Sequence, residues 1–302
     1  MYSSRLLAAC LCFLLATCAS QSPAGAAKKI LESENSRYGL VSVHDADGKR
    51  YISIGAQEQS GVNLANKREW VYTYMYLLSL GILAAEPGIA DRPARVLIIG
   101  LGGGRFSDFL AEVYPQWSID VVEINPAVIR LAKKYFPIDK RVNIIEADGR
   151  AFLAKTKNKY DVILMDAFGE HYIPPELYTV EYFTLLKSRL VGGGLTLMNT
   201  WEGNPVEAQG IATLRSVFAQ GYWIHHPDET PGNRIYILGD KLATIATLRK
   251  SISDDFSRRG FPGASPGKVL AAMRDTASAP KAAPITDRSV RALFRKYGKN
   301  WD

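Results

Sequence analysis

Cysteine is scarce in this chain of 302 residues, and its three cysteines, Cys10, Cys12 and Cys18, all lie near the N-terminus. The rest of the chain therefore cannot form a disulfide, a thiolate metal site or a cysteine nucleophile. No apolar run reaches the roughly 20 residues that a membrane-spanning helix needs. The chain is 47% apolar, which at this length is typical of a globular protein with one large core and appendages.

The first 26 residues have the pattern of a secretory signal peptide. Arg5 precedes a short apolar run over 6–16, and Ala24-Gly25-Ala26 supplies a small-residue cleavage site. This pattern predicts export to the periplasm after cleavage. In one alternative, a lipoprotein signal, Cys18 becomes lipidated and anchors the protein at the outer surface. In another, the start codon is misassigned or the helix stays uncleaved; a misassigned leader would leave the protein cytoplasmic.

The formal net charge is +7, which permits anionic partners. The basic residues are dispersed, however, and no basic stripe with interleaved aromatic residues occurs. We therefore do not expect nucleic-acid binding.

Residues 36–90 are predicted to form a β-hairpin followed by a helix. Apolar residues alternate over 38–54 on both sides of a turn at Asp45-Ala46-Asp47-Gly48. The dense apolar pattern over 68–85 suits a largely buried helix that ends near Pro87.

Residues 91–240 alternate between strands and helices. This order predicts an α/β, doubly wound, Rossmann-like sheet of the S-adenosylmethionine-dependent methyltransferase type. The expected strands are 96–99, 119–122, 142–145, 162–165 and 195–198, and the expected helices are 106–113, 126–135, 150–154 and 180–190. A helix over 206–218 and an antiparallel pair at 222–225 and 234–238 follow. Residues 241–302 are predicted to form a helical C-terminal extension.

The glycine loop after the first of these strands is the first candidate ligand site, since ligands of open α/β sheets bind at the carboxyl ends of the strands. Gly100, Gly102 and Gly104 let the backbone approach a ligand and offer N–H groups at a helix N-terminus. Arg105 breaks the dinucleotide pattern, which favours a nucleoside without a pyrophosphate. The alternative is that the glycines only permit close packing of strand and helix.

Three acids follow the next strands. Glu123 lies about twenty residues beyond the loop, where an acid can accept hydrogen bonds from both ribose hydroxyls. Asp148, followed by Gly149, is either a contact to the adenine amine or the N-cap of the next helix. Asp166 stands where the reacting part of a nucleoside substrate would lie, and it could take a proton from an amine.

Several motifs together resemble the spermidine synthase (polyamine aminopropyltransferase) family over roughly residues 36–240. They are Arg95-Val96-Leu97-Ile98-Ile99-Gly100, Val122-Glu123-Ile124-Asn125-Pro126, Asp148-Gly149-Arg150, Tyr160-Asp161-Val162-Ile163, Leu177-Tyr178-Thr179 and Gly192-Gly193-Gly194. The resemblance implies transfer of an aminopropyl group from decarboxylated S-adenosylmethionine to an amine, without a metal. Glu123 would then hold the ribose, Asp148 the adenine, and Asp166 would accept the proton. Gln57 or Gln59 would lie near the nucleoside, and Tyr72 and Tyr178 would contact substrate.

The chain departs from the family at charged positions. The family's loop aspartate is replaced by Gly103, and its second acid after the proton acceptor by Gly169. Where the family's helix carries a glutamate and a histidine, this chain has Tyr74 and Leu78. Candidate substitutes for the missing acids are Glu170, Glu176 and Glu202, and His171 is an alternative base. The aromatic run Trp70, Tyr72, Tyr74 and Tyr76 either lines a pocket for a cation or packs in the core.

Three functions stay open at this point. The first is an aminopropyltransferase with altered amine specificity. The second is a methyltransferase or other user of intact S-adenosylmethionine, because losing the loop aspartate relaxes discrimination between the two cofactors. The third is a non-catalytic nucleoside- or polyamine-binding protein, which export would suit because the cofactor is made in the cytoplasm. A homodimer is one option for the assembly, whose oligomeric state the sequence leaves open.

Overall fold

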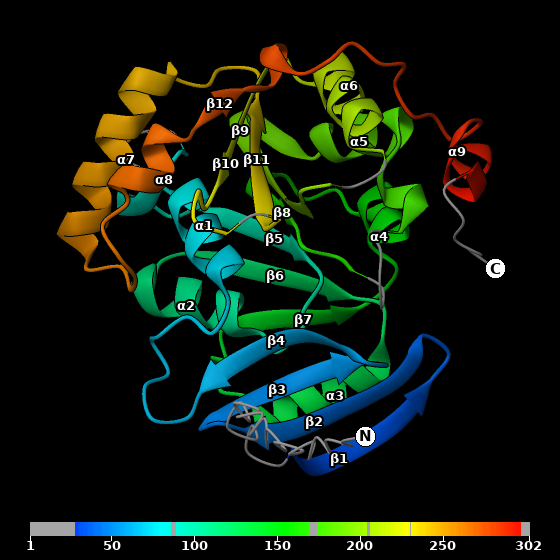
Figure 1. The fold of residues 1–302 in the computed structure, drawn as a ribbon, viewed down its shortest axis with the longest axis vertical. Helices are drawn as coiled ribbons and strands as arrows, with labels where there is room; N and C mark the ends of the chain where they lie inside the picture. Colours follow the sequence, from blue (N-terminus) through cyan, green and yellow to red (C-terminus); the bar gives the residue numbers. More distant parts are fainter. Residues whose placement is uncertain (1–27, 86–88, 169–173, 204–205, 230, 297–302) are drawn as a thin grey trace, which may run out of the picture.

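The computed structural model describes residues 28–85, 89–168, 174–203, 206–229 and 231–296. They form two β-sheets and the helices that cover them (Figure 1). The leader and the candidate cleavage and lipidation sites lie outside the described residues. Among the helices of the described part, none is long and apolar enough to cross a bilayer.

The N-terminal sheet is antiparallel, with strand order β1-β2-β3-β4. Its strands are β1 (Lys29–Ser36), β2 (Gly39–Ala46), β3 (Lys49–Ile54) and β4 (Gln57–Asn63). The expected hairpin is the inner pair, β2 and β3, whose turn at Ala46–Lys49 is closed by cross-strand pairing. The flanking strands β1 and β4 were not predicted, because both are rich in polar residues and pair mainly through their backbones.

The large sheet has the order β12-β10-β11-β9-β8-β5-β6-β7. Five neighbouring strands, β9, β8, β5, β6 and β7, run parallel. The strands are β5 (Arg95–Ile99), β6 (Ser118–Glu123), β7 (Val142–Glu146), β8 (Tyr160–Met165), β9 (Leu190–Trp201), β10 (Gln220–His225), β11 (Asn233–Gly239) and β12 (Arg274–Asp275). The doubly wound fold is confirmed, and so is the antiparallel pairing of β10 with β11. β9 is longer than the expected 195–198, which brings Asn199 and Trp201 to its carboxyl end.

Helices cover both faces of the large sheet (Figure 1). They are α1 (Thr73–Ile82), α2 (Arg105–Val113), α3 (Pro126–Tyr135), α4 (Gly149–Lys155), α5 (Val180–Lys187), α6 (Glu207–Val217), α7 (Ile245–Arg259), α8 (Gly267–Ala271) and α9 (Val290–Lys296), with 3-10 turns η1 (Ile89–Asp91), η2 (Pro175–Leu177) and η3 (Thr276–Ser278). Alternate residues of β5 face the two cores: Val96 and Ile98 pack with α1, α2, α3, α7 and α8, while Leu97 and Ile99 pack with α4, α5, α6 and α9.

The first helix begins later than the periodicity predicted. Residues 64–72 form turns instead, since the Asn63 side chain accepts hydrogen bonds from the backbone N–H groups of Ala65 and Asn66. The helix α1 packs against β9 and β11 of the large sheet. A Cβ atom at Gly81 would lie 3.1 Å from Leu197, so the glycine permits this close approach.

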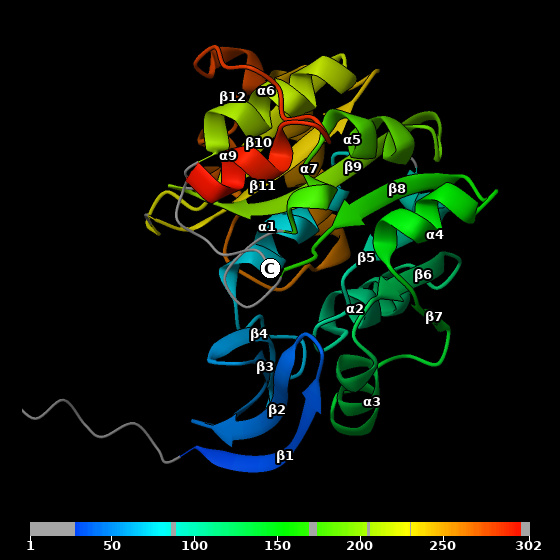
Figure 2. The same cartoon turned by 90° about the vertical axis from the view of Figure 1, so that its right-hand side faces the viewer.

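The C-terminal segment over 279–296, here called the strap, runs back across α5 and α6 towards the carboxyl ends of the parallel strands (Figure 2). Ile285 is fully buried; its N–H donates to Thr213 Oγ1 and its carbonyl accepts from Val180 N–H, both at 2.8 Å. Asp287 accepts from Arg150 at 2.9 Å and from Thr179 at 2.6 Å. These bonds fasten α9 beside η2.

Candidate functional site

A cavity of about 1840 Å³ lies at the carboxyl ends of β5, β6, β7, β8 and β9. The N-terminal sheet, the start of α1, η2 and α9 form its other walls. Its volume exceeds the roughly 300–1,000 Å³ of an ordinary ligand pocket, so two small molecules can be held side by side.

The glycine loop needs glycine for packing as well as for access. A Cβ atom at Gly100, where φ is +106°, would lie 2.2 Å from the carbonyl oxygen of Asp166. Gly100 and Gly102 line the cavity, but Gly104 is not among the lining residues, and its Cβ direction points at Ile138. For Gly104 the structure therefore favours the packing explanation over ligand contact. A Cβ atom at Gly103 would lie 2.8 Å from the Phe136 ring, so an aspartate at this position would displace that ring.

Glu123 ends β6 and lines the cavity. One carboxylate oxygen accepts from Leu101 N–H at 2.9 Å and the other from Asn125 N–H at 2.8 Å. The carboxylate is thus tied to the glycine loop rather than freely solvated, and burial raises its pKa. With backbone hydrogen bonds from Leu101, Asn125 and Ile124, the carboxylate keeps at least one lone pair for a ligand hydroxyl.

Asp148 caps a helix and also lines the cavity. Its Oδ1 accepts from Ala151 N–H at 2.7 Å, which is an N-cap bond to α4. Asp148 and Gly149 also line the cavity beside β5. A Cβ atom at Gly149 would lie 2.6 Å from Ile99, so this glycine is required for packing against the strand.

Asp166 follows β8 and is the most perturbed acid of the cavity. Burial raises its pKa from 3.8 to about 7, and a hydrogen bond from Asn199 Nδ2, at 2.8 Å, opposes the rise. Asn199 in turn accepts from Asn233 Nδ2 at 3.0 Å. The two asparagines form an amide relay that holds Oδ1 of Asp166. They were missed because only acids were sought at the strand ends, although Asn199 directly follows the strand predicted over 195–198, and Met198 pairs with Met165, the residue before Asp166.

The tyrosines divide between the cavity and the core. Tyr72 lines the cavity and donates to Glu58 at 2.8 Å, and Tyr74 lies close enough to Asp166 that burial and this charge raise its pKa well above the usual range. Trp70 instead packs edge-on against Phe109, and Tyr76 donates to the carbonyl of Ala264. The core explanation therefore holds for these last two.

The other predicted contacts are placed as follows. Gln57 and Gln59 both line the cavity. Tyr178 also lines it, but its hydroxyl end lies over Gly210 of α6, so its ring is the part available to a ligand. Leu78 is fully buried in the core and is not among the residues that line the cavity.

The candidate substitutes for the missing acids differ in whether they line the cavity. Glu176 lines the cavity at η2. Glu202 is not among the residues that line it, and its carboxylate pairs with Arg234 at 2.9 Å. Gly169, Glu170 and His171 lie outside the described residues.

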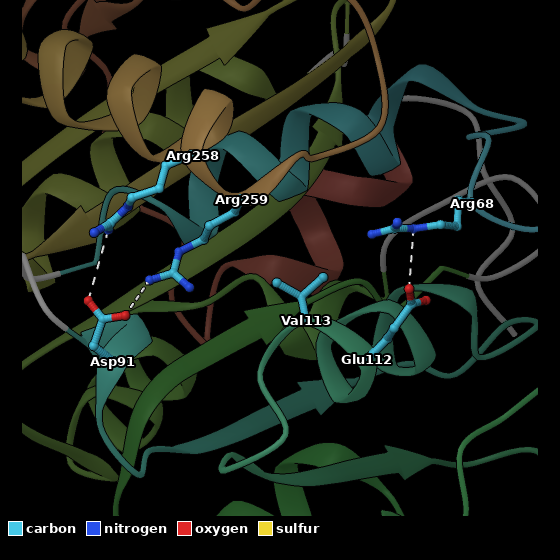
Figure 3. A pocket seen from close by; sticks show the side chains of 6 residues that line it. All are labelled: Arg68, Asp91, Glu112, Val113, Arg258 and Arg259. Atoms are coloured by element: carbon cyan, nitrogen blue, oxygen red, sulfur yellow. Dashed lines mark hydrogen bonds and ion pairs between the residues drawn. The ribbon is translucent and has the colours of Figure 1, made fainter.

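A second hollow, of about 330 Å³, lies away from the strand ends (Figure 3). Its arginines are matched by acids: Arg68 pairs with Glu112 at 3.2 Å, and Arg259 pairs with Asp91 at 2.7 Å. This hollow is therefore a paired charged surface. Within the described ranges, no group of three or more His, Cys, Asp or Glu side chains is placed to hold a metal ion.

Comparison with known proteins identifies relatives of this arrangement. Residues 80–221 match the spermine/spermidine synthase domain. A polyamine aminopropyltransferase of Vibrio vulnificus is 32% identical over 213 residues, which is 69% of this chain and 71% of that protein. Among solved structures, a probable spermidine synthase from Corynebacterium glutamicum has a TM-score of 0.68 at 22% identity, covering 83% of this chain and 95% of that one. Human methyltransferase-like protein 13 in complex with SAH has a TM-score of 0.56 at 21% identity, covering 63% and 94%.

Proposed function

Because the chain belongs to the spermine/spermidine synthase family, we propose that it transfers an aminopropyl group from decarboxylated S-adenosylmethionine to an amine. The observation that carries this proposal is the series of acids at the carboxyl ends of the parallel strands. Glu123 ends β6, Asp148 follows β7 and Asp166 follows β8, and all three line one cavity with the glycine loop that follows β5. In the strand order β7-β6-β5-β8 they supply contacts for an adenine, a ribose and, beyond the glycine loop, an amine.

The reaction needs a neutral amine and a place for its proton. The amine nitrogen forms a bond to the propyl carbon next to the sulfonium, the carbon–sulfur bond breaks, and its electron pair stays on sulfur, which leaves methylthioadenosine. The surplus proton on the new secondary ammonium goes to Asp166. A carboxylate with a pKa of about 7 is a stronger base than an exposed aspartate and is still ionised at mildly alkaline pH.

The donor site differs from the family pattern at Gly103. With Phe136 filling the Cβ direction, no carboxylate faces the propyl ammonium from this position. This supports a site with relaxed discrimination, and the second candidate function is therefore use of intact S-adenosylmethionine in methyl transfer.

Calorimetric titration separates these functions. The purified protein is titrated with decarboxylated S-adenosylmethionine, intact S-adenosylmethionine and methylthioadenosine, and products are then analysed with an amine present. Methylthioadenosine release supports aminopropyl transfer, and S-adenosylhomocysteine release supports methyl transfer. Tight binding without turnover would favour a non-catalytic nucleoside-binding protein, and binding of none of the three would refute a nucleoside site.

We further propose that the protein is exported, on the basis of the leader pattern in residues 1–26. N-terminal sequencing of the protein recovered from cell fractions tests this. A start near Ala27 in the periplasmic fraction agrees with signal-peptide cleavage, a lipidated Cys18 identifies the anchored form, and an intact Met1 in the cytoplasm refutes export. Light scattering of the same sample distinguishes a monomer from a homodimer.

A further inference from the structure

The acceptor side of the cavity lies beyond Asp166. The large sheet runs in the order β11-β9-β8-β5-β6-β7, and the glycine loop, Glu123 and Asp148 follow β5, β6 and β7. A nucleoside on that side leaves the carboxyl end of β9, and the amino end of β11 that pairs with it, for the amine. Six residues line the cavity there: Phe168, Tyr178, Asn199, Trp201, Val206 and Asn233.

This wall is aromatic and uncharged. The rings of Phe168 and Trp201 lie 5.6 Å apart at an angle of 34°. The amide of Asn199 is already engaged between Asp166 and Asn233. Among the described residues of the wall, none carries a charge.

Two acids near this wall, Glu202 and Glu58, have partners of their own. Glu202 directly follows Trp201 in sequence, but its carboxylate pairs with Arg234. Glu58 on β4 accepts from Tyr72 at 2.8 Å and also faces His44 and Lys28.

Glu176 is exposed on η2, which contacts α9, and Arg291 and Arg295 of α9 line the same cavity. Of the described acids that line the cavity, Asp166 is the one that directly follows β8, next to the end of β9 in this wall.

A diamine would bring a second ammonium into this wall. An ammonium removed from water without a carboxylate loses more hydration free energy than the face of an aromatic ring returns. An apolar or aromatic tail gains by leaving water at the same place.

We propose that the acceptor is a primary monoamine with an apolar or aromatic tail, which lies against Phe168 and Trp201 while Asp166 binds its nitrogen. This assignment rests on the proposed aminopropyl transfer. The amine nitrogen forms the new bond to the propyl carbon, the carbon–sulfur bond breaks with its electron pair on sulfur, and Asp166 takes the proton.

The test compares putrescine with n-butylamine, which has the same carbon chain and lacks the second ammonium. Methylthioadenosine release is measured with saturating decarboxylated S-adenosylmethionine. We expect kcat/KM for n-butylamine to exceed that for putrescine at least tenfold, and phenethylamine to behave like n-butylamine. Equal or better use of putrescine would overturn the acceptor assignment while leaving aminopropyl transfer intact. No product from any amine would overturn both.

Variants of Trp201 check the wall directly. Trp201→Glu should raise the ratio of putrescine to n-butylamine kcat/KM at least tenfold, because it supplies the missing carboxylate. The matched control, Trp201→Phe, keeps the aromatic wall and should change that ratio less than threefold. Unchanged methylthioadenosine affinity in both variants shows that the cavity is intact. An unaltered ratio in a Trp201→Glu protein that still binds methylthioadenosine would contradict the proposal.

Discussion

Replacing Asn199 with alanine should change the pH dependence of the reaction rather than only its rate. The Asn199 amide donates to Oδ1 of Asp166 at 2.8 Å and lowers the pKa of that carboxyl, against the burial that raises it to about 7. A hydrogen bond to a charged group contributes about 1.5–3 kcal/mol. Each pKa unit corresponds to about 1.4 kcal/mol, so losing the bond should raise the pKa of Asp166 to about 8–9.

The assay follows kcat/KM for methylthioadenosine release between pH 6 and pH 10 in the wild type and the Asn199→Ala variant. Titration of the amine is the same for both enzymes and cancels in their ratio. We expect the variant to be about tenfold slower at pH 7 and to approach the wild type above pH 9, since a protonated Asp166 cannot accept the proton.

Two comparisons make this prediction specific. Asn233→Ala leaves Asn199 in place but removes its support at 3.0 Å, so a smaller shift in the same direction is expected. Thr196→Val is the control, because Thr196 lies on the same strand and its hydroxyl has no hydrogen-bond partner among the described residues. If the rate of Asn199→Ala were reduced by the same factor at every pH, Asn199 would have only a structural role and the reasoning would be refuted.

Three further predictions concern the same cavity. Asp166→Asn should abolish transfer with little change in nucleoside affinity. The variant should also have a higher Tm than the wild type at pH 8, because ionising a carboxyl whose pKa is raised to about 7 costs the folded wild type on the order of 4 kcal/mol. This difference in stability should vanish below about pH 4, where the carboxyl is protonated in both the folded and the unfolded state. Glu123→Ala should weaken methylthioadenosine binding measured by calorimetry, and an unchanged Kd would exclude Glu123 from the ribose site. Gly100→Ala should lower Tm by roughly 6–12 °C, since a Cβ atom 2.2 Å from a backbone oxygen costs about 3 kcal/mol or more; an unchanged Tm would show that the loop can relax.

The parallel part of the fold could be predicted from the sequence because its strands are short, apolar and separated by amphipathic helices. Val162 to Met165, for example, reads as a strand buried on both faces, and it is one. The outer strands of the N-terminal sheet gave no such signal. These strands are stabilised by pairing with β2 and β3, and such pairing cannot be read from the local sequence.

The candidate site divides in the same way. The acids at the strand ends stand out because a carboxylate after a buried strand needs an explanation. The relay through Asn199 and Asn233 does not, because it joins residues 34 apart in the chain that become neighbours only when β11 pairs with β9. The ion pair between Glu202 and Arg234 likewise depends on that pairing of strands.

The strap determines when during synthesis the cavity becomes complete. The glycine loop and the three acids are translated before residue 170, whereas Val290, Arg291 and Arg295, which line the cavity from α9, come more than a hundred residues later. Their anchors, Ile285 and Asp287, bond to Thr213, Val180 and Arg150, so the last part of the chain closes over parts made much earlier. In a nascent chain the three acids are therefore present while one wall is still missing, and ligand binding can reinforce the fold fully only after the C-terminal segment has docked.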